Sequence, residues 1–184
     1  MKKGLFGCLG CLGVVVVIVI IIAVIATVSG GGDSSSSNKN ETKDAKIGEK
    51  VKVDDIEYTI NSVETADSVG NQYVSSSADG KYIVADVTVK NNGDESITID
   101  TELFKIIDGD ATNGADSSAS TDANTSASNP SDIGFFLEKL NPGNEKTGKV
   151  VFDVSEKTAQ SDNTKMQVKS GIFGSQKANI DIAQ

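Results

Sequence analysis

The chain changes its hydrophobic pattern twice along its length. Residues 8–28 contain no charged side chain, and the run from Val14 onward reads VVVVIVIIIAVIATV. Residues 29–46 are mainly glycine, serine and charged residues. In residues 47–184 apolar and polar residues alternate in short segments, which is the pattern of half-buried β-strands. After a short N-terminal segment, residues 1–7, the sequence therefore predicts a membrane-inserting segment, a linker and a folded domain.

Residues 8–28 have the length of a transmembrane helix. At about 1.5 Å rise per residue, such a segment just crosses a hydrocarbon core of about 30 Å. A helix is expected because backbone groups in lipid must be paired within the segment. Lys2 and Lys3 favour a cytoplasmic N-terminus and an exported C-terminal domain, although two lysines also follow the segment closely. The alternative is a signal peptide that is cleaved near residues 28–30 and leaves a secreted protein.

The linker and the domain differ in composition. Residues 29–46 have too few apolar side chains to bury a core, so they predict a flexible stalk. Residues 47–184 are long enough for one domain with a hydrophobic core. The predicted strands of this domain are residues 50–53, 56–63, 81–90, 96–100, 103–107, 148–154, 166–168 and 179–182.

The clearest strand pattern lies at residues 81–90, KYIVADVTVK. Period-two alternation assigns one set of side chains to the core and the other to the opposite face. The predicted core face comprises Ile83, Ala85, Val87 and Val89, and the opposite face comprises Tyr82, Val84, Asp86 and Thr88. The sequence NNGD at residues 91–94 predicts a tight hairpin to the next strand. Pro142 and Gly143 predict a β-turn.

Roughly seven to nine short strands predict an all-β fold, either a sandwich or a barrel. Two long polar stretches, residues 64–80 and 111–132, fit Greek-key crossings between sheets. The second stretch consists almost entirely of Ser, Thr, Ala, Asn and Asp. Its composition predicts a disordered loop. Beyond residue 30 no segment shows a helical period.

Composition excludes several functions. Lys2 and Lys3 precede every acidic residue, which leaves 15 lysines against 26 acidic residues, a formal charge of −11 outside the N-terminal segment. Such a surface repels nucleic acid and anionic lipid headgroups. The chain has no Arg, His or Trp. It therefore lacks the side chains that most often read guanine, act as general bases and bind metals.

The two cysteines, Cys8 and Cys11, lie at the start of the apolar run. The domain has none, so it contains no disulfide, thiol nucleophile or thiolate metal site. Zinc would need four ligands, and no others lie near this pair. A lipidated Cys8 is not expected, because a lipoprotein cysteine follows the apolar run of its signal peptide.

One stretch supports a calcium-binding hypothesis. Asp108, Asp110, Asn113 and Asp116 offer oxygen ligands at short spacing, which suits calcium chemistry. The stretch departs from the helix-loop-helix calcium motif, because Ala119 stands where a bidentate glutamate is required. The alternative is a solvated turn at the end of a hairpin.

An enzymatic role is not expected, and neither is a cofactor. Asp54 and Asp55 form a carboxylate pair that could in principle serve a glycosidase. Neighbouring residues on a strand point to opposite faces, however, and this pair has the character of a turn. Without His, Arg or a cysteine in the domain, the usual catalytic groups are missing.

Two segments resemble a known family. Residues 82–95, YIVADVTVKNNGDE, are similar to the central strand and hairpin of a family of extracytoplasmic bacterial immunoglobulin-like domains of unknown function, common in Gram-positive bacteria. Residues 140–154, LNPGNEKTGKVVFDV, resemble its second signature, a Pro-Gly turn that leads into a Gly-x-Val-x-Phe strand. Residues 47–49 with 56–63 resemble its opening hairpin. The sequence departs from the family at residues 111–115, which lack the usual aromatic residue and so argue against a strand there.

The resemblance implies an immunoglobulin-like β-sandwich, similar to the secreted mycobacterial MPT/MPB antigens, behind a membrane helix or lipoprotein signal. Some members are labelled telomeric repeat-binding factors, a label that this acidic, arginine-free sequence does not support. The family supplies no catalytic or binding residues. We therefore expect a non-catalytic module, anchored through residues 8–28, which binds an extracytoplasmic protein or envelope partner and no nucleic acid. The alternatives are a calcium- or small-ligand-binding domain and a secreted form.

Overall fold

The structure is a computed structural model of the chain, and it describes residues 43–125, 135–172 and 174–183. The predicted transmembrane segment, residues 8–28, lies outside the described residues. Within the described ranges, no helix has the length and apolar content that a membrane crossing needs. The strands are β1 (Lys43–Lys46), β2 (Lys50–Val53), β3 (Ile56–Gly70), β4 (Ser75–Asn91), β5 (Ile97–Thr98), β6 (Phe104–Asp108), β7 (Ala111–Gly114), β8 (Lys139–Leu140), β9 (Glu145–Val154), β10 (Lys165–Lys169) and β11 (Lys177–Asp181).

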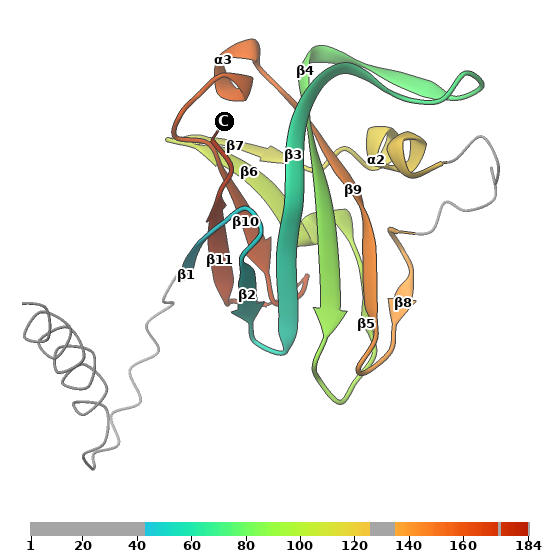
Figure 1. Cartoon of the computed structure of the whole chain (residues 1–184), viewed down its shortest axis with the longest axis vertical. Helices are drawn as coiled ribbons and strands as arrows, with labels where there is room; N and C mark the ends of the chain where they lie inside the picture. The colour runs from blue at the N-terminus through green and yellow to red at the C-terminus, as the bar shows by residue number, and fades with distance from the viewer. Residues whose placement is uncertain (1–42, 126–134, 173, 184) are drawn as a thin grey trace, which may run out of the picture. The chain divides into compact units, whose positions relative to one another are not determined.

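Two sheets form the body of the domain (Figure 1). Sheet A has the strand order β1-β11-β10-β6-β7, and sheet B has the order β2-β3-β4-β9. β5 and β8 form a separate two-stranded pair. In the described part of the chain, three short helices lie between strands: the 3-10 helix η2 (Thr101–Leu103) and the α-helices α2 (Ser117–Asn124) and α3 (Glu156–Ala159). The prediction of an all-β fold is confirmed.

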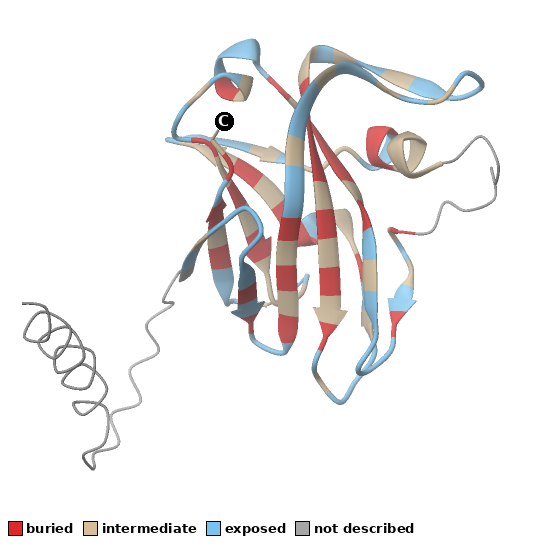
Figure 2. Cartoon of the chain, in the orientation of Figure 1, coloured by how far each residue is buried: buried red, intermediate tan, exposed pale blue. Residues whose placement is uncertain are grey.

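The core lies between the two sheets, where their inward faces meet (Figure 2). On β4, Val87 and Val89 are fully buried, and Ile83 and Ala85 are buried beside them. On sheet A the same role belongs to Phe104, Met166 and Ile180. The predicted core face of residues 81–90 is therefore confirmed, and both sheets contribute to one apolar layer.

Two residues on the inward faces, a tyrosine with a polar hydroxyl and a glycine, are explained by their neighbours. Tyr58 is fully buried, and its hydroxyl donates to the Lys169 carbonyl oxygen at 2.7 Å, so a core ring on sheet B is tied to sheet A. Gly148 on β9 leaves space for the Phe135 ring, which a Cβ would approach to 2.4 Å. These pairings explain why a tyrosine and a glycine stand at buried strand positions.

The hairpin predicted at residues 91–94 is wrong. β4 pairs with β3 and β9, whereas the next strand, β5, pairs with β8. Asn91 is buried, and its Nδ2 donates to the carbonyl oxygens of Glu95 and Leu140. The chain therefore leaves sheet B at Asn91 in a loop fixed by this amide. The predicted turn at Pro142 is confirmed: Gly143 has φ +77° and the Asn144 amide donates to the Asn141 carbonyl oxygen.

The expected crossing at residues 64–80 is also wrong. This segment continues β3 and β4 as an antiparallel hairpin beyond the sandwich, with irregular register near Ser62 and Ser68. Figure 1 shows this hairpin bending away from the sheets over α2. Backbone pairing, rather than apolar alternation, extends the two strands, because only half-buried and exposed side chains line most of its length. We call residues 64–80 the arm.

The loop predicted to be disordered at residues 111–132 is ordered from 111 to 125, and the rest lies outside the described residues. β7 pairs with β6, which corrects the expectation that residues 111–115 lack a strand. Residues 117–124 form α2, so the expectation that no helix follows residue 30 is wrong. The segment does connect the two sheets as predicted, from β7 in sheet A to β9 in sheet B.

The predicted stalk is shorter than expected. Residues 43–46 of the segment assigned to the linker form β1, which pairs in parallel with β11. Ala45 packs against the core, so the strand is attached by its side chains as well as its backbone. The folded domain therefore includes residues 43–46, which the prediction assigned to the linker.

Candidate functional site

α2 lies against the free edge of β9 and replaces a neighbouring strand. Asn124 donates to the Lys149 carbonyl oxygen at 2.7 Å and accepts from the Lys149 amide at 2.8 Å. One turn earlier, the Ser120 hydroxyl accepts from the Val151 amide at 2.9 Å. The Asp116 amide donates to the Val151 carbonyl oxygen at 2.7 Å. These bonds pair the edge groups of a sheet strand that would otherwise be open to another chain.

A second, smaller apolar cluster holds α2 in place. Ala119 is fully buried against Tyr82, Val84 and Val151, which project from the outer face of sheet B. The prediction placed Tyr82 and Val84 on this outer face, but α2 covers them. Asp116 begins the helix, because its carboxylate accepts from the Ala119 amide at 2.9 Å. The small side chains of α2 therefore allow the helix to pack closely on the sheet.

The arm packs on the other side of α2. Ala66, Val69 and Ala78 of the arm contact the same apolar cluster. The Ser76 hydroxyl donates to the Asp122 carboxylate at 2.6 Å, and the Asn71 amide group donates to the Thr125 carbonyl oxygen at 3.2 Å. The arm and β9 thus hold the helix between them, as Figure 1 shows.

The tip of the arm presents two apolar side chains on a fixed turn. Tyr73 is 76% exposed and Val74 is 47% exposed. The Asn71 side chain accepts from both of their amides, at 2.8 and 3.2 Å, and the Asn71 amide donates to the Val74 carbonyl oxygen at 2.7 Å. The backbone is therefore organised before any partner binds, which reduces the entropy lost on binding. Tyrosine is also enriched among the residues that dominate interface energies.

The structure does not bring the calcium candidates together in one cage. Asp108 accepts from the Ser161 hydroxyl at 2.8 Å, and Asp110 lies in the exposed turn after β6. Asn113 donates to the Asp153 carbonyl oxygen at 3.4 Å, and Asp116 caps α2. Among the described residues, no three His, Cys, Asp or Glu side chains are placed to hold a metal ion. A calcium titration followed by calorimetry tests the hypothesis directly.

The carboxylate pair Asp54 and Asp55 forms the turn between β2 and β3. Asp54 has φ +57°, a conformation that aspartate tolerates in tight turns. Asp55 lies 3.5 Å from the Lys52 ammonium. In this structure both residues belong to a surface turn.

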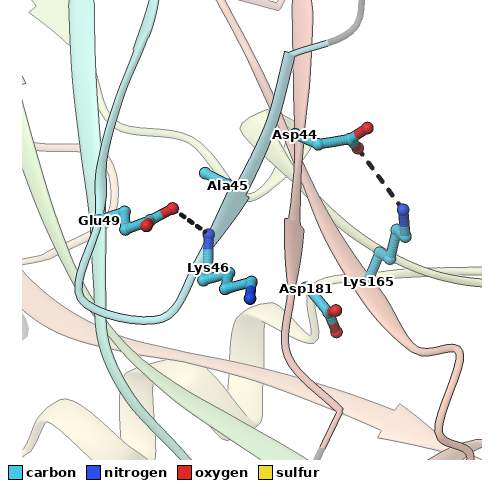
Figure 3. Close-up of a pocket in the computed structure, with 6 residues that line it drawn as sticks. All are labelled: Asp44, Ala45, Lys46, Glu49, Lys165 and Asp181. Atoms are coloured by element: carbon cyan, nitrogen blue, oxygen red, sulfur yellow. Dashed lines mark hydrogen bonds and ion pairs between the residues drawn. The ribbon is translucent and has the colours of Figure 1, made fainter. Parts of the chain in front are cut away.

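A shallow pocket of about 220 Å³ lies at the edge of sheet A (Figure 3). Several of its charged groups already have partners within the domain. The Lys165 ammonium lies 3.5 Å from Asp44, and Glu49 accepts from the Lys46 amide at 2.9 Å. Asp181 completes the lining beside them. Most of its lining residues are charged and it is open to solvent, so it lacks the enclosed, largely hydrophobic lining typical of a small-molecule site.

The sequence did contain indications of α2 and of the arm tip. Alanines recur every fourth residue at 115, 119 and 123, and Asp116, Ser120 and Asn124 follow the same spacing. That spacing places each set on one helical face. Tyr73 and Val74 form an apolar pair in an otherwise polar stretch, and alternation alone gave no reason to place them at a hairpin tip.

Comparison with known proteins identifies the family. Residues 45–179 match the family model described as Domain of unknown function (DUF4352). The chain belongs to this family. A relative, the Uncharacterized protein YxkC of Bacillus subtilis (strain 168), is 30% identical over 134 residues, which cover 71% of this chain and 74% of the relative. The DUF4352 assignment covers β2 to β10 and includes both the arm and α2.

Solved structures show the same fold. An uncharacterized β-sandwich protein from Clostridium difficile 630 has a TM-score of 0.51 at 18% identity, and the match covers 81% of this chain and 99% of that chain. The secreted protein MPT63 from Mycobacterium tuberculosis has a TM-score of 0.51 at 15% identity, and the match covers 79% and 99% of the two chains. The DUF4352 domain of this chain is therefore a β-sandwich of a type known from bacterial proteins.

Proposed function

We propose that this protein is a non-catalytic interaction module, an immunoglobulin-like domain displayed outside the cell on a single-pass membrane anchor. The observation that carries the proposal is the arm tip. There Tyr73 and Val74 are exposed on a turn that the Asn71 side chain already fixes. A protein partner in the envelope would gain apolar contact with these two side chains without first ordering the loop.

The extracytoplasmic location has separate support. Residues 8–28 form an uncharged apolar run that follows two lysines, the arrangement of a signal anchor. MPT63, which shares the fold, is a secreted protein. In this proposal the N-terminus stays in the cytoplasm, and the stalk before Lys43 presents the domain outside.

The arm also has a structural role, because it holds α2 against β9. The two roles make different predictions for the tip. A purely structural arm needs Asn71, whose side chain bonds Thr125, but it does not need the exposed ring of Tyr73. A binding arm needs Tyr73 and Val74.

A photo-crosslinking amino acid at position 73 tests the proposal in intact cells. We expect a discrete crosslinked product that is lost in Val74→Ser, with unchanged thermal stability of the domain. The matched control places the same amino acid at Asn163, an exposed position in the turn before β10. Equal crosslinking at both positions, or no product at position 73, would contradict an interaction through the tip.

The anchor needs its own measurement. We expect the protein to fractionate with membranes, to resist salt and carbonate, and to be released by detergent. If the mature N-terminus instead maps near Gly31 and the protein is found in the medium, the segment is a cleaved signal.

A further inference from the structure

Sheet A has an unusual group of lysines on its solvent-facing side. Lys105, Lys169 and Lys177 alternate with the buried residues of β6, β10 and β11, so all three face outward. Lys169 lies directly opposite Lys177, and Lys105 is opposite Gln167, the next outward residue on β10. We call these three residues the lysine patch.

The lysine patch differs from the rest of this acidic surface. Several lysines elsewhere on the sheets lie beside carboxylates: Lys50 lies 2.9 Å from Glu57 and Lys165 lies 3.5 Å from Asp44. Among described residues, no carboxylate forms an ion pair with a lysine of the patch. Like charges directly opposite each other on neighbouring strands are destabilising. The arrangement therefore lowers the stability of the domain, although the chain contains many acidic residues that could have paired with these lysines.

The electrostatics of Lys169 reflect this crowding. Partial burial lowers the pKa of its ammonium, and the charges of Lys105 and Lys177 lower it further. Glu102 acts in the opposite direction and is the weakest influence. The lysine patch is thus a site where an added anion would relieve repulsion.

The position of the patch suggests where that anion lies. β11 runs parallel to β1, and Lys177 precedes Ala178, the partner of Lys43. The patch therefore lies at the end of sheet A where the chain enters the domain from its stalk. Asp181 lies at the other end of the same face, beside the pocket of Figure 3. At that end Asp181 lies opposite Lys165, so the outer face of sheet A carries the lysine patch near Lys43 and charges of both signs at its other end.

A hydrophobic residue lies close in the chain to two of these lysines, Lys169 and Lys177. The loop between β10 and β11 contains Ile172, whose side chain is exposed. Lysines beside an exposed apolar residue are typical of surfaces that bind at a lipid interface. The formal charge of −11 opposes binding to an anionic surface. At physiological salt, however, charges farther than about 8 Å from the contact are largely screened.

We propose that the lysine patch docks the domain on the anionic headgroups of a lipid bilayer. This proposal rests on the membrane anchor proposed above, because a tethered domain is held near the bilayer at high local concentration. Docking would bring sheet A toward the bilayer and leave the arm tip, on the far side of α2, available to a protein partner. Anionic lipids attract each lysine near the surface, so three together give useful but reversible binding.

Lysine acetylation of the full chain in nanodiscs tests the proposal. One set of nanodiscs contains phosphatidylcholine alone, and the other an equal mixture of phosphatidylcholine and phosphatidylglycerol. We expect Lys105, Lys169 and Lys177 to react roughly tenfold more slowly in the anionic nanodiscs, and the difference to disappear at high salt. Lys157, in α3, should react equally in both. Equal labelling of the patch in both lipids would overturn the proposal.

A charge-matched pair of variants separates the patch from net charge. In the patch variant, Lys169→Gln/Lys177→Gln, Lys105 should be acetylated at the same rate in both kinds of nanodisc. In the control variant, Lys139→Gln/Lys157→Gln, Lys105 should still be acetylated more slowly in the anionic nanodiscs. The patch variant removes repulsion, so its melting temperature should not fall. A separate experiment measures the membrane anchor: the full chain is inserted into phosphatidylcholine vesicles and extracted with carbonate. If the chain is extracted, the anchor fails; if it is retained but the patch is unprotected, only the docking fails.

Discussion

Asn124 binds both backbone groups of Lys149, donating to its carbonyl oxygen at 2.7 Å and accepting from its amide at 2.8 Å. A side-chain amide on a helix thereby reproduces the two bonds that a neighbouring strand would make. The edge of β9 is closed to other chains at this point without another strand. The same relationship explains why a segment of poor helix formers is ordered, since its polar side chains are bonded to the sheet.

Replacing Asn124 with alanine should lower the free energy of unfolding by about 1–2 kcal/mol, because two half-buried backbone groups lose their partner. Denaturant unfolding of the domain fragment, residues 39–184, measures the change. Asn124→Asp keeps the acceptor but loses the donor, so its free energy of unfolding should lie between those of the wild type and Asn124→Ala. Asn163→Ala, at an exposed position, should match the wild type. If all three variants unfold alike, the edge bonds contribute nothing.

Replacing residues 113–131 with a short Gly-Ser link should lower the melting temperature by roughly 10 °C. The deletion removes α2, exposes Tyr82, Val84 and Val151 to water, and opens the edge of β9. Composition alone predicts no change, because a disordered loop adds little stability. Calorimetry of the fragment distinguishes the two expectations. Increased aggregation of the shortened fragment would be a further consequence of the open edge.

Val87→Asp should prevent folding of the fragment, because Val87 is fully buried and an unpaired charge there costs several kcal/mol. Thr88→Asp should be tolerated with a loss of about 1 kcal/mol. Thr88 faces outward, where its hydroxyl lies 2.7 Å from that of Thr147. Circular dichroism of the two purified variants tests the register of β4. Equal behaviour of the neighbours would contradict that register.

Tyr58 should make the domain less stable in alkali. Burial raises the pKa of its hydroxyl above the usual value of about 10. Above that pH the unfolded chain loses this proton while the folded chain keeps it, so stability is full below about pH 10 and falls as the pH rises. Tyr58→Phe should reduce this slope and cost about 1 kcal/mol at neutral pH, from the lost bond to Lys169.

Denaturant unfolding across the alkaline range measures the slope. Tyr82, whose pKa is also raised by burial, remains in each protein and contributes in the same direction. Tyr73→Phe changes an exposed ring and should follow the wild-type profile. A wild-type slope in Tyr58→Phe would show that other groups control alkaline unfolding.

The sequence was sufficient for the parts of the fold that depend on alternation. Ile83, Ala85, Val87 and Val89 on β4 were placed correctly because a two-residue period assigns each residue to one face. Pairing partners were harder, because they depend on distant residues. Asn91 looked like the start of a hairpin, yet its amide bonds Leu140, which lies in another part of the chain.

The candidate site was the least predictable part. α2 contains Ser, Thr, Asn and Asp, which are poor helix formers, and tertiary bonds to β9 decide its conformation. The arm is a similar case, since Ala66, Val69 and Ala78 pack against an apolar cluster that Ala119 of α2 completes. Composition therefore indicated disorder in a segment whose order comes from its partners.

The pairing of β1 with β11 also determines the order in which the domain is completed. A ribosome makes residues 43–46 well before residues 177–181, but these strands are partners in the sheet. The first strand must therefore wait through the synthesis of almost the entire domain before its hydrogen bonds can form. β1 thus cannot join sheet A until β11 has been made, and a chain truncated before residue 177 would leave its first strand without a place in the sheet.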